Sequence, residues 1–173
     1  MKNAVNISFG SGDLSGGFGT DLCTLGGAES NLEIKDFSFG SVLKQRNIFN
    51  SFDALVGLAY PSMAHENHVP LFDQLMATKQ LENNLFAFFL SFNPKQEESE
   101  LTLGYYDEAR YVPETLHWHD VTNPVFFAVE LLDVRIGEKS LNLCGPSSVE
   151  GKNCTITPDS GTSAITMPDW AWK

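Results

Sequence analysis

The residue types best suited to chemistry lie in the segment Thr155–Ile165, where a short apolar run leads into Asp159 and another leads away. Asp159 is followed by the small hydroxyl residue Ser160 and then by Gly161, which has no side chain. The hydroxyls of Thr162 and Ser163 can hydrogen-bond back onto such a loop. This pattern predicts a buried carboxylate on a tight turn whose backbone is held in place.

The tripeptide Asp159–Gly161 has a simpler interpretation when it is taken alone. Asp, Ser and Gly are ordinary turn residues, and Asp is also a good N-cap for a following helix. The three residues by themselves therefore favour a plain turn over a reactive carboxylate. The choice between the two interpretations depends on the rest of the chain.

Six further segments resemble, in the same order, segments of the pepsin-like (A1) aspartic proteases. They are the flap hairpin Asn6–Gly16, the Phe-Asp block Phe52–Ser62, the short helix Pro70–Leu75, the strand Asn84–Leu90, and the segments Glu100–Tyr105 and Leu116–Val121. The resemblance covers nearly the whole chain and is far more specific than the tripeptide. The sequence is identified as part of such a protease, from the flap to just past the second Asp-Ser/Thr-Gly loop.

The resemblance implies an all-β fold with short helices, in the bilobal arrangement of pepsin-like enzymes, of which this chain holds an incomplete part. Residues 1–110 are expected to form the later part of the N-terminal lobe, including the flap. Residues 111–173 are expected to form the inter-lobe strands and the first part of the C-terminal lobe, with the catalytic loop. The chain stops soon after Pro168, where a helix begins that is too short to be stable alone, so we expect a fragment.

The implied activity is aspartic endopeptidase activity. Two carboxylates share one proton because two like charges so close cannot both ionise, and they activate a water molecule between them. Asp159 resembles the second Asp of this pair, with Ser160, Gly161 and Thr162 completing its loop. The first Asp-Thr-Gly of the family should precede the flap and is absent from these residues, so activity of this chain alone stays open. The alternative is an inactive fragment, or a homologue that binds peptides without cutting them.

The segments that resemble the flap and the Phe-Asp block imply a substrate pocket. Phe9 stands where the family has a Tyr, and Gly10, Ser11 and Gly12 form the tip of the hairpin. The residues that match the pocket wall are Phe52 and Leu55, although their types alone would place them in a core. An apolar pocket implies cleavage at bulky hydrophobic residues.

Three cysteines are present, and two of them, Cys144 and Cys154, flank a turn-rich segment. The residues alone allow either two thiols or a bridge, whereas the resemblance implies the disulfide that precedes the second catalytic Asp. Cys23 has no evident partner. A bridged pair and the family together indicate a secreted or endolysosomal (vacuolar) protein, although no signal peptide is visible at the start of the chain.

The amino-acid composition limits the classes of partner that we expect for this chain. The formal net charge is −11 and no Lys/Arg cluster is present, which argues against nucleic acid and anionic membranes. No apolar run is long enough to span a bilayer. The four histidines, at positions 65, 68, 117 and 119, lack the spacing of a metal site, so no cofactor is expected. We expect peptide or protein substrates and a monomeric parent enzyme.

Local patterns predict the elements that must position these residues. The predicted elements are a hairpin of Val5–Phe9 and Leu14–Gly19, a half-buried strand Leu32–Phe39, a helix between Pro70 and Asn83, and a long apolar strand Val125–Ile136. The segment Gly137–Lys139 is expected to turn the chain after that strand.

Overall fold

The computed structural model describes residues 4–9, 12–26, 32–47, 53–65, 68–146 and 153–172. The chain divides into two compact units, Met1–His117 and Trp118–Lys173, and each is described by itself. The predicted assignment of residues 1–110 and 111–173 to the two lobes stays a prediction.

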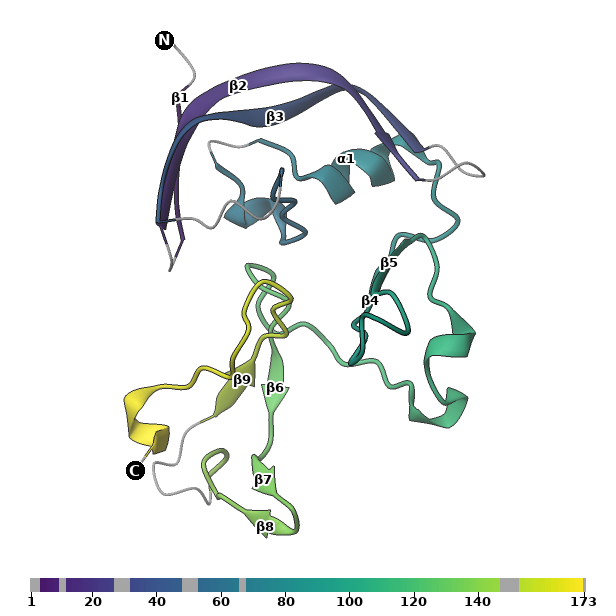
Figure 1. Ribbon diagram of the computed structural model, residues 1–173. Helices are drawn as coiled ribbons and strands as arrows, with labels where there is room; N and C mark the ends of the chain where they lie inside the picture. The colour runs from purple at the N-terminus through teal and green to yellow at the C-terminus, as the bar shows by residue number, and fades with distance from the viewer. Residues whose placement is uncertain are drawn as a thin grey trace. The chain divides into compact units, whose positions relative to one another are not determined.

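The first unit is built on an antiparallel sheet with the order β1-β2-β3 (Figure 1). Its strands are β1 (Ala4–Phe9), β2 (Gly12–Leu25) and β3 (Leu32–Arg46). The predicted hairpin is confirmed, with Phe9 opposite Gly12 across a two-residue connection. Both long strands exceed their predicted ends, because their backbones remain paired beyond the point where the apolar alternation fades.

The ladder between β2 and β3 is interrupted by a register shift, and both strands curve strongly in Figure 1. Ser15 pairs with Lys44 but Gly16 pairs with Val42, so one residue of β3 is extra. Such a bulge bends a strand. Glycine is required at position 16, since a Cβ there would lie 1.8 Å from the carbonyl oxygen of Ser41.

The predicted helix is present as α1 (Leu71–Thr78), which contacts β3. Pro70 precedes it with an extended backbone, and the carbonyl of Pro70 accepts a hydrogen bond from the Gln74 N–H at 3.0 Å. The helix ends at Lys79, which adopts the left-handed conformation (φ 58°) usual at helix C-termini. The apolar face of α1 supplies the core with Phe72 and Leu75, both buried.

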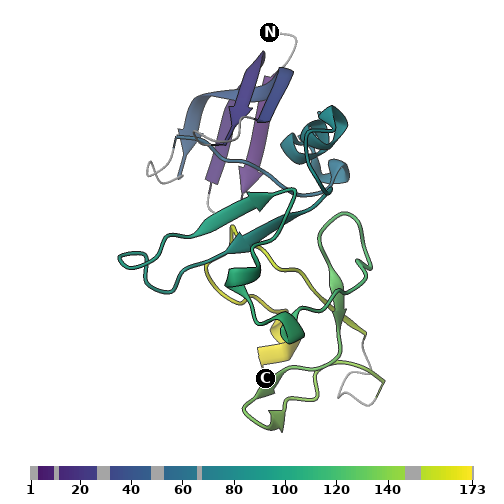
Figure 2. The same cartoon turned by 90° about the vertical axis from the view of Figure 1, so that its right-hand side faces the viewer.

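A second pair of strands continues this core. β4 (Phe86–Phe89) and β5 (Glu100–Leu103) lie side by side and antiparallel (Figure 2). The ring of Phe72 meets that of Phe86 edge to face, with centroids 5.0 Å apart. Helix α1 is therefore packed between β3 and the β4–β5 pair.

The second unit contains two short antiparallel pairs. β6 (Val129–Leu131) pairs with β9 (Cys154–Ile156), and β7 (Arg135–Ile136) pairs with β8 (Lys139–Ser140). The predicted turn after β7 is confirmed, with Gly137 at φ 60°.

The prediction of one long strand over Val125–Ile136 is wrong. Residues 124–127 form a turn, closed by hydrogen bonds from the Thr122 N–H to the Ala128 carbonyl (2.8 Å) and from the Phe126 N–H to the Asn123 carbonyl (3.2 Å). Pro124 fixes φ and has no N–H to donate to a ladder, which favours the turn over the strand. The strand is then broken again between β6 and β7.

The architecture is mostly β, with α1 and short 3-10 turns, which confirms the predicted fold class. The final segment forms one such turn, η5 (Asp169–Trp172). Among the described residues, no helix is long and apolar enough to cross a membrane.

Candidate functional site

Strand β9 and a disulfide position the Asp159 loop. Val129 of β6 pairs with Ile156, the last residue of β9, and Asp159 follows three residues later. Cys144 and Cys154 are bonded, with their Cα atoms 5.5 Å apart, so the implied disulfide is confirmed. The start of β9 is thus held by a covalent bond and the rest by backbone pairing.

The loop closes around the carboxylate of Asp159. Its Oδ1 accepts a hydrogen bond from the Gly161 N–H at 2.9 Å, and its Oδ2 accepts one from the Thr162 hydroxyl at 2.6 Å. The Thr162 N–H also donates to the Asp159 carbonyl at 3.2 Å. An Asp that bonds the backbone two residues on forms an Asx-turn, which its sequence favours. The prediction that Thr162 bonds back onto the loop is confirmed.

Gly161 is required here for close approach rather than for an unusual backbone angle. A Cβ at position 161 would lie 3.2 Å from Oδ1 of Asp159, which is tighter than ordinary contact. The absence of a side chain lets the carboxylate come within hydrogen-bond distance of the Gly161 N–H.

Asp159 is exposed within the structure, so the prediction of a buried carboxylate is wrong. β9 has only three residues paired with β6, and in the described part of the unit the loop 157–166 extends past this two-stranded sheet. The hydrogen bond from Thr162, and after it the one from the Gly161 N–H, lower the pKa of Asp159, against a small opposing effect of burial. Both donors stabilise the charged form.

The arrangement favours an ionised carboxylate that can accept a proton. Each carboxylate oxygen can accept about two hydrogen bonds, and the loop supplies one donor to each oxygen of Asp159. Acceptor capacity therefore remains on both oxygens for a water molecule or a second carboxylic acid. A carboxylate in this state can act as a general base.

The structure places only some of the other predicted site residues. Phe9 and Gly12 face each other across the hairpin, and Leu55 is 54% exposed. Ser160 is exposed in the loop. Gly10, Ser11 and Phe52 lie outside the described residues. The residues brought into mutual contact are Asp159, Gly161 and Thr162, and separately the two bridged cysteines.

The histidines pack or stay at the surface. The ring of His68 stacks on Phe18 with centroids 3.5 Å apart, and its Nδ1 lies 3.2 Å from the hydroxyl of Ser38. Within the described ranges, no group of three His, Cys, Asp or Glu side chains is arranged to hold a metal ion.

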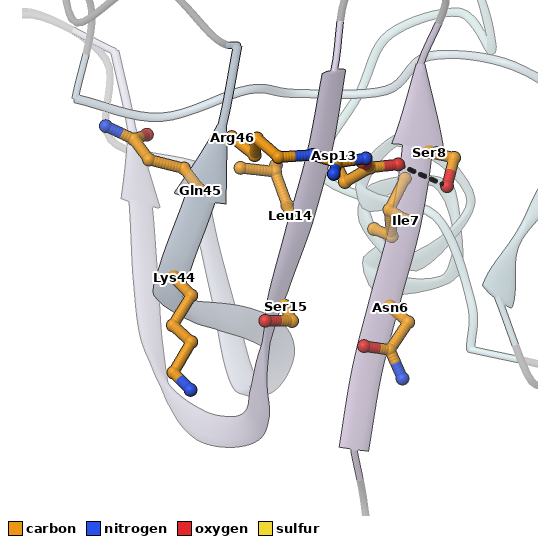
Figure 3. A pocket seen from close by; sticks show the side chains of 9 residues that line it. All are labelled: Asn6, Ile7, Ser8, Asp13, Leu14, Ser15, Lys44, Gln45 and Arg46. Atoms are coloured by element: carbon orange, nitrogen blue, oxygen red, sulfur yellow. Dashed lines mark hydrogen bonds and ion pairs between the residues drawn. The ribbon is translucent and has the colours of Figure 1, made fainter.

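Sequence reasoning missed a polar cluster at the end of the flap hairpin, formed by Ser8, Asp13 and Arg46 (Figure 3). The predicted hairpin left Asp13 outside both strands, whereas in the structure β2 begins at Gly12 and Ser8 lies opposite Asp13. Arg46 was likewise outside the predicted elements, since β3 was predicted to end at Phe39.

Comparison with known proteins agrees with this geometry. The chain matches the family described as eukaryotic aspartyl protease over residues 1–173. It is 35% identical to cathepsin D of Chionodraco hamatus and 31% identical to cathepsin E of Cavia porcellus, over 97% of the chain in each case and 41% of each relative. Cathepsin D of Gallus gallus is 35% identical over 94% of the chain and 39% of the relative. The chain thus spans about two fifths of the length of these relatives, and it belongs to the eukaryotic aspartyl protease family.

Proposed function

We propose that this chain is part of an aspartic endopeptidase in which Asp159 is one of the two catalytic carboxylates. The observation that carries the proposal is the Asp159 loop, in which Thr162 and Gly161 donate to separate carboxylate oxygens. Membership of the aspartyl protease family supports the same role. Ser160, Gly161 and Thr162 act as supports that fix the orientation of the carboxylate.

In the proposed reaction, Asp159 and a second Asp share one proton and hold a water molecule. The ionised carboxylate takes a proton from the water molecule while the water oxygen attacks the peptide carbonyl carbon. The protonated carboxyl donates its proton to the carbonyl oxygen. The tetrahedral intermediate then breaks its C–N bond while the newly protonated carboxyl gives its proton to the leaving nitrogen. A hydroxyl of the intermediate passes its proton to the other carboxylate, which forms the carboxylic acid product and restores the single proton of the pair. The donors to Asp159 favour its ionised form, but titration belongs to the pair as a whole.

The proposed substrates are peptides or proteins with bulky hydrophobic residues at the cleaved bond. The flap hairpin would cover the substrate with Phe9, Gly10, Ser11 and Gly12, and the pocket wall would include Phe52 and Leu55. The support for this role is the apolar character of Phe9, Phe52 and Leu55. Neither nucleic acid nor a membrane is part of the proposal, and the enzyme is proposed to work as a monomer without a cofactor.

The proposed location is secreted or endolysosomal (vacuolar). The Cys144–Cys154 disulfide supports it, because such bonds persist in oxidising compartments and are rare in the cytosol. The family membership supports the same location.

The test is the Asp159→Asn substitution in the full-length protein, assayed on a hydrophobic peptide at acidic pH. We expect kcat to fall by at least about a hundredfold, the lower end of the range for general acid–base catalysis. The matched control is Asp133→Asn, since Asp133 also accepts from a hydroxyl and lies in the same unit. Turnover that survives Asp159→Asn would contradict the proposal.

A second candidate is a homologue that binds peptides without cutting them. Phe9 favours it, because the family has at this position a Tyr whose hydroxyl joins a hydrogen-bond network over the substrate. A peptide with a reduced, non-cleavable bond between two hydrophobic residues separates the two candidates. Binding of this peptide together with no turnover of its cleavable parent would support the second candidate.

A further inference from the structure

The carboxylate of Asp13 joins the three strands of the first sheet at the end of the flap hairpin. Its Oδ1 accepts from the Ser8 hydroxyl of β1 at 2.9 Å. Its Oδ2 accepts from Nη2 and Nε of Arg46, in β3, at 2.7 Å and 3.2 Å. Figure 3 shows Asp13 between these two partners, above an open pocket lined by the three strands.

The position of this cluster in the strand ladder is specific. Ser8 pairs with Asp13, and Asp13 pairs with Arg46, so the three residues stand in one row across the sheet. Among the described residues, one ladder pair lies closer to the hairpin tip, that of Phe9 with Gly12. Asp13 therefore acts immediately behind the tip.

The bulge interrupts the β2–β3 pairing behind this end of the hairpin, whereas the β1–β2 pairing runs past it without a shift. On the tip side of the register shift, β2 and β3 share the pairs Ser15–Lys44, Leu14–Gln45 and Asp13–Arg46. The side chains of Asp13 and Arg46 are 44% and 77% exposed. Because no described side chain of 6–8, 12–15 or 44–46 is buried, polar contacts across the strands have a large share in holding the described end of the hairpin.

The contacts of Asp13 favour its ionised form. Hydrogen bonds from Ser8, and after it from Arg46, lower the pKa of Asp13. Lys44, which lines the same pocket from β3, is the other charged side chain in the lining. The positive charge of Arg46 favours the ionised form of the Asp13 carboxylate.

We propose that Asp13, held by Ser8 and Arg46, is a positioning residue that holds the end of the flap hairpin, at the Phe9–Gly12 pair, in place for substrate binding. This inference rests on the proposed function, since it requires the hairpin to cover a substrate. Asp13 itself need not touch the substrate. A loosened hairpin end weakens binding of the substrate and of the transition state alike. Loss of the Asp13 contacts should therefore raise KM and leave kcat unchanged.

The test measures peptide hydrolysis by the full-length protein carrying Asp13→Asn, Arg46→Gln, or both. Each single substitution is expected to raise KM by about two- to fivefold, the range of an exposed ion pair, with kcat within about twofold. The double variant should resemble either single variant, because each removes the same interaction. The charge exchange Asp13→Arg with Arg46→Asp should restore part of the lost affinity.

The control is Asp133→Asn, because Asp133 accepts from the Ser140 hydroxyl at 3.0 Å and from Arg135 at 3.1 Å, outside the flap. An unchanged KM in Asp13→Asn, an equal change in Asp133→Asn, or additive effects of the two flap substitutions would overturn the inference.

The experiments distinguish failure of the proposed function from failure of this inference. The proposed function fails if turnover survives Asp159→Asn, whereas this inference fails through the KM of the Asp13 variant. If the protein binds the non-cleavable peptide without turnover, the same variants are compared by its dissociation constant, with the same expected ratios. Absence of binding by the unsubstituted protein would overturn the inference.

Discussion

The Thr162 hydroxyl donates a hydrogen bond to Oδ2 of Asp159 at 2.6 Å, from a residue only three positions further along the chain. The contact is local, so it needs no packing from distant elements. It also stabilises the charged form of the carboxylate more than any other contact that lowers its pKa. Residues of the Asp159 loop itself therefore favour the ionised form of this carboxylate.

Replacing Thr162 by Val keeps the shape of the side chain and removes this donor. The pKa of Asp159 is expected to rise, because only the weaker backbone donor of Gly161 would remain. Titration of the carboxyl carbon by NMR measures the change. Thr166→Val, at an exposed position four residues further along the chain than Thr162, is the control and should leave the pKa of Asp159 unaltered.

The same pair predicts a pH dependence of stability. The pKa of Asp159 in the folded state lies below its ordinary value of 3.8, so ionisation contributes stability above that value. This contribution is lost as the pH falls through the lowered pKa. Thr162→Val should therefore lower the free energy of unfolding by an amount that depends on pH. The pH-dependent part of this loss should reach its full size at about pH 5 and vanish in strong acid. A difference that grows on acidification would contradict the assignment.

The disulfide should contribute substantially to the stability of the second unit. Cys144 and Cys154 are 10 residues apart, and in the chain-entropy model a loop of this size is worth about 3 kcal/mol. Replacing both by Ser should lower the free energy of unfolding by about this amount in urea denaturation. Cys23→Ser, which removes a free thiol, is the control. Equal stability of the two variants would contradict the prediction.

The parts of the fold that sequence predicts are those with local causes. The turn residues of Asn6–Gly16 indicate the hairpin, and Pro70 with Leu71 and Leu75 indicates α1, because each signal lies within a few residues of its effect. The Asp159 loop is local in the same sense, and its hydrogen bonds were predictable from the types of Gly161 and Thr162.

The parts that sequence did not predict depend on distant pairing or packing. The bulge beside Gly16 arises where β2 meets a strand whose facing residue, Val42, is 26 positions away, and no local pattern marks it. The contact between Asp13 and Arg46 has the same origin. Exposure of Asp159 depends on which elements pack over its loop, which no motif near Asp159 encodes.

A substitution at Leu75 of α1 tests how much the core of the first unit contributes to stability. The exposed fraction of Leu75 is 0%, and replacing it by Ala removes apolar burial and leaves a cavity. The expected loss is about 2–5 kcal/mol in the free energy of unfolding. Leu90→Ala is the control, because Leu90 is 64% exposed and should cost far less. Chemical denaturation of both variants measures the difference, and similar losses would show that α1 does not anchor this core.

A substitution at Gly16 tests the bulge that interrupts the pairing of β2 with β3. A Cβ at this position would meet the Ser41 carbonyl oxygen at 1.8 Å, and a backbone atom cannot move aside without disturbing the β2–β3 pairing. Gly16→Ala is expected to lower the free energy of unfolding by roughly 1–3 kcal/mol, the usual cost of overpacking. Gly57→Ala is the matched control, since nothing lies within 4 Å of a Cβ there. Two equally stable variants would mean that β2 and β3 do not approach as closely at Gly16 as the structure shows.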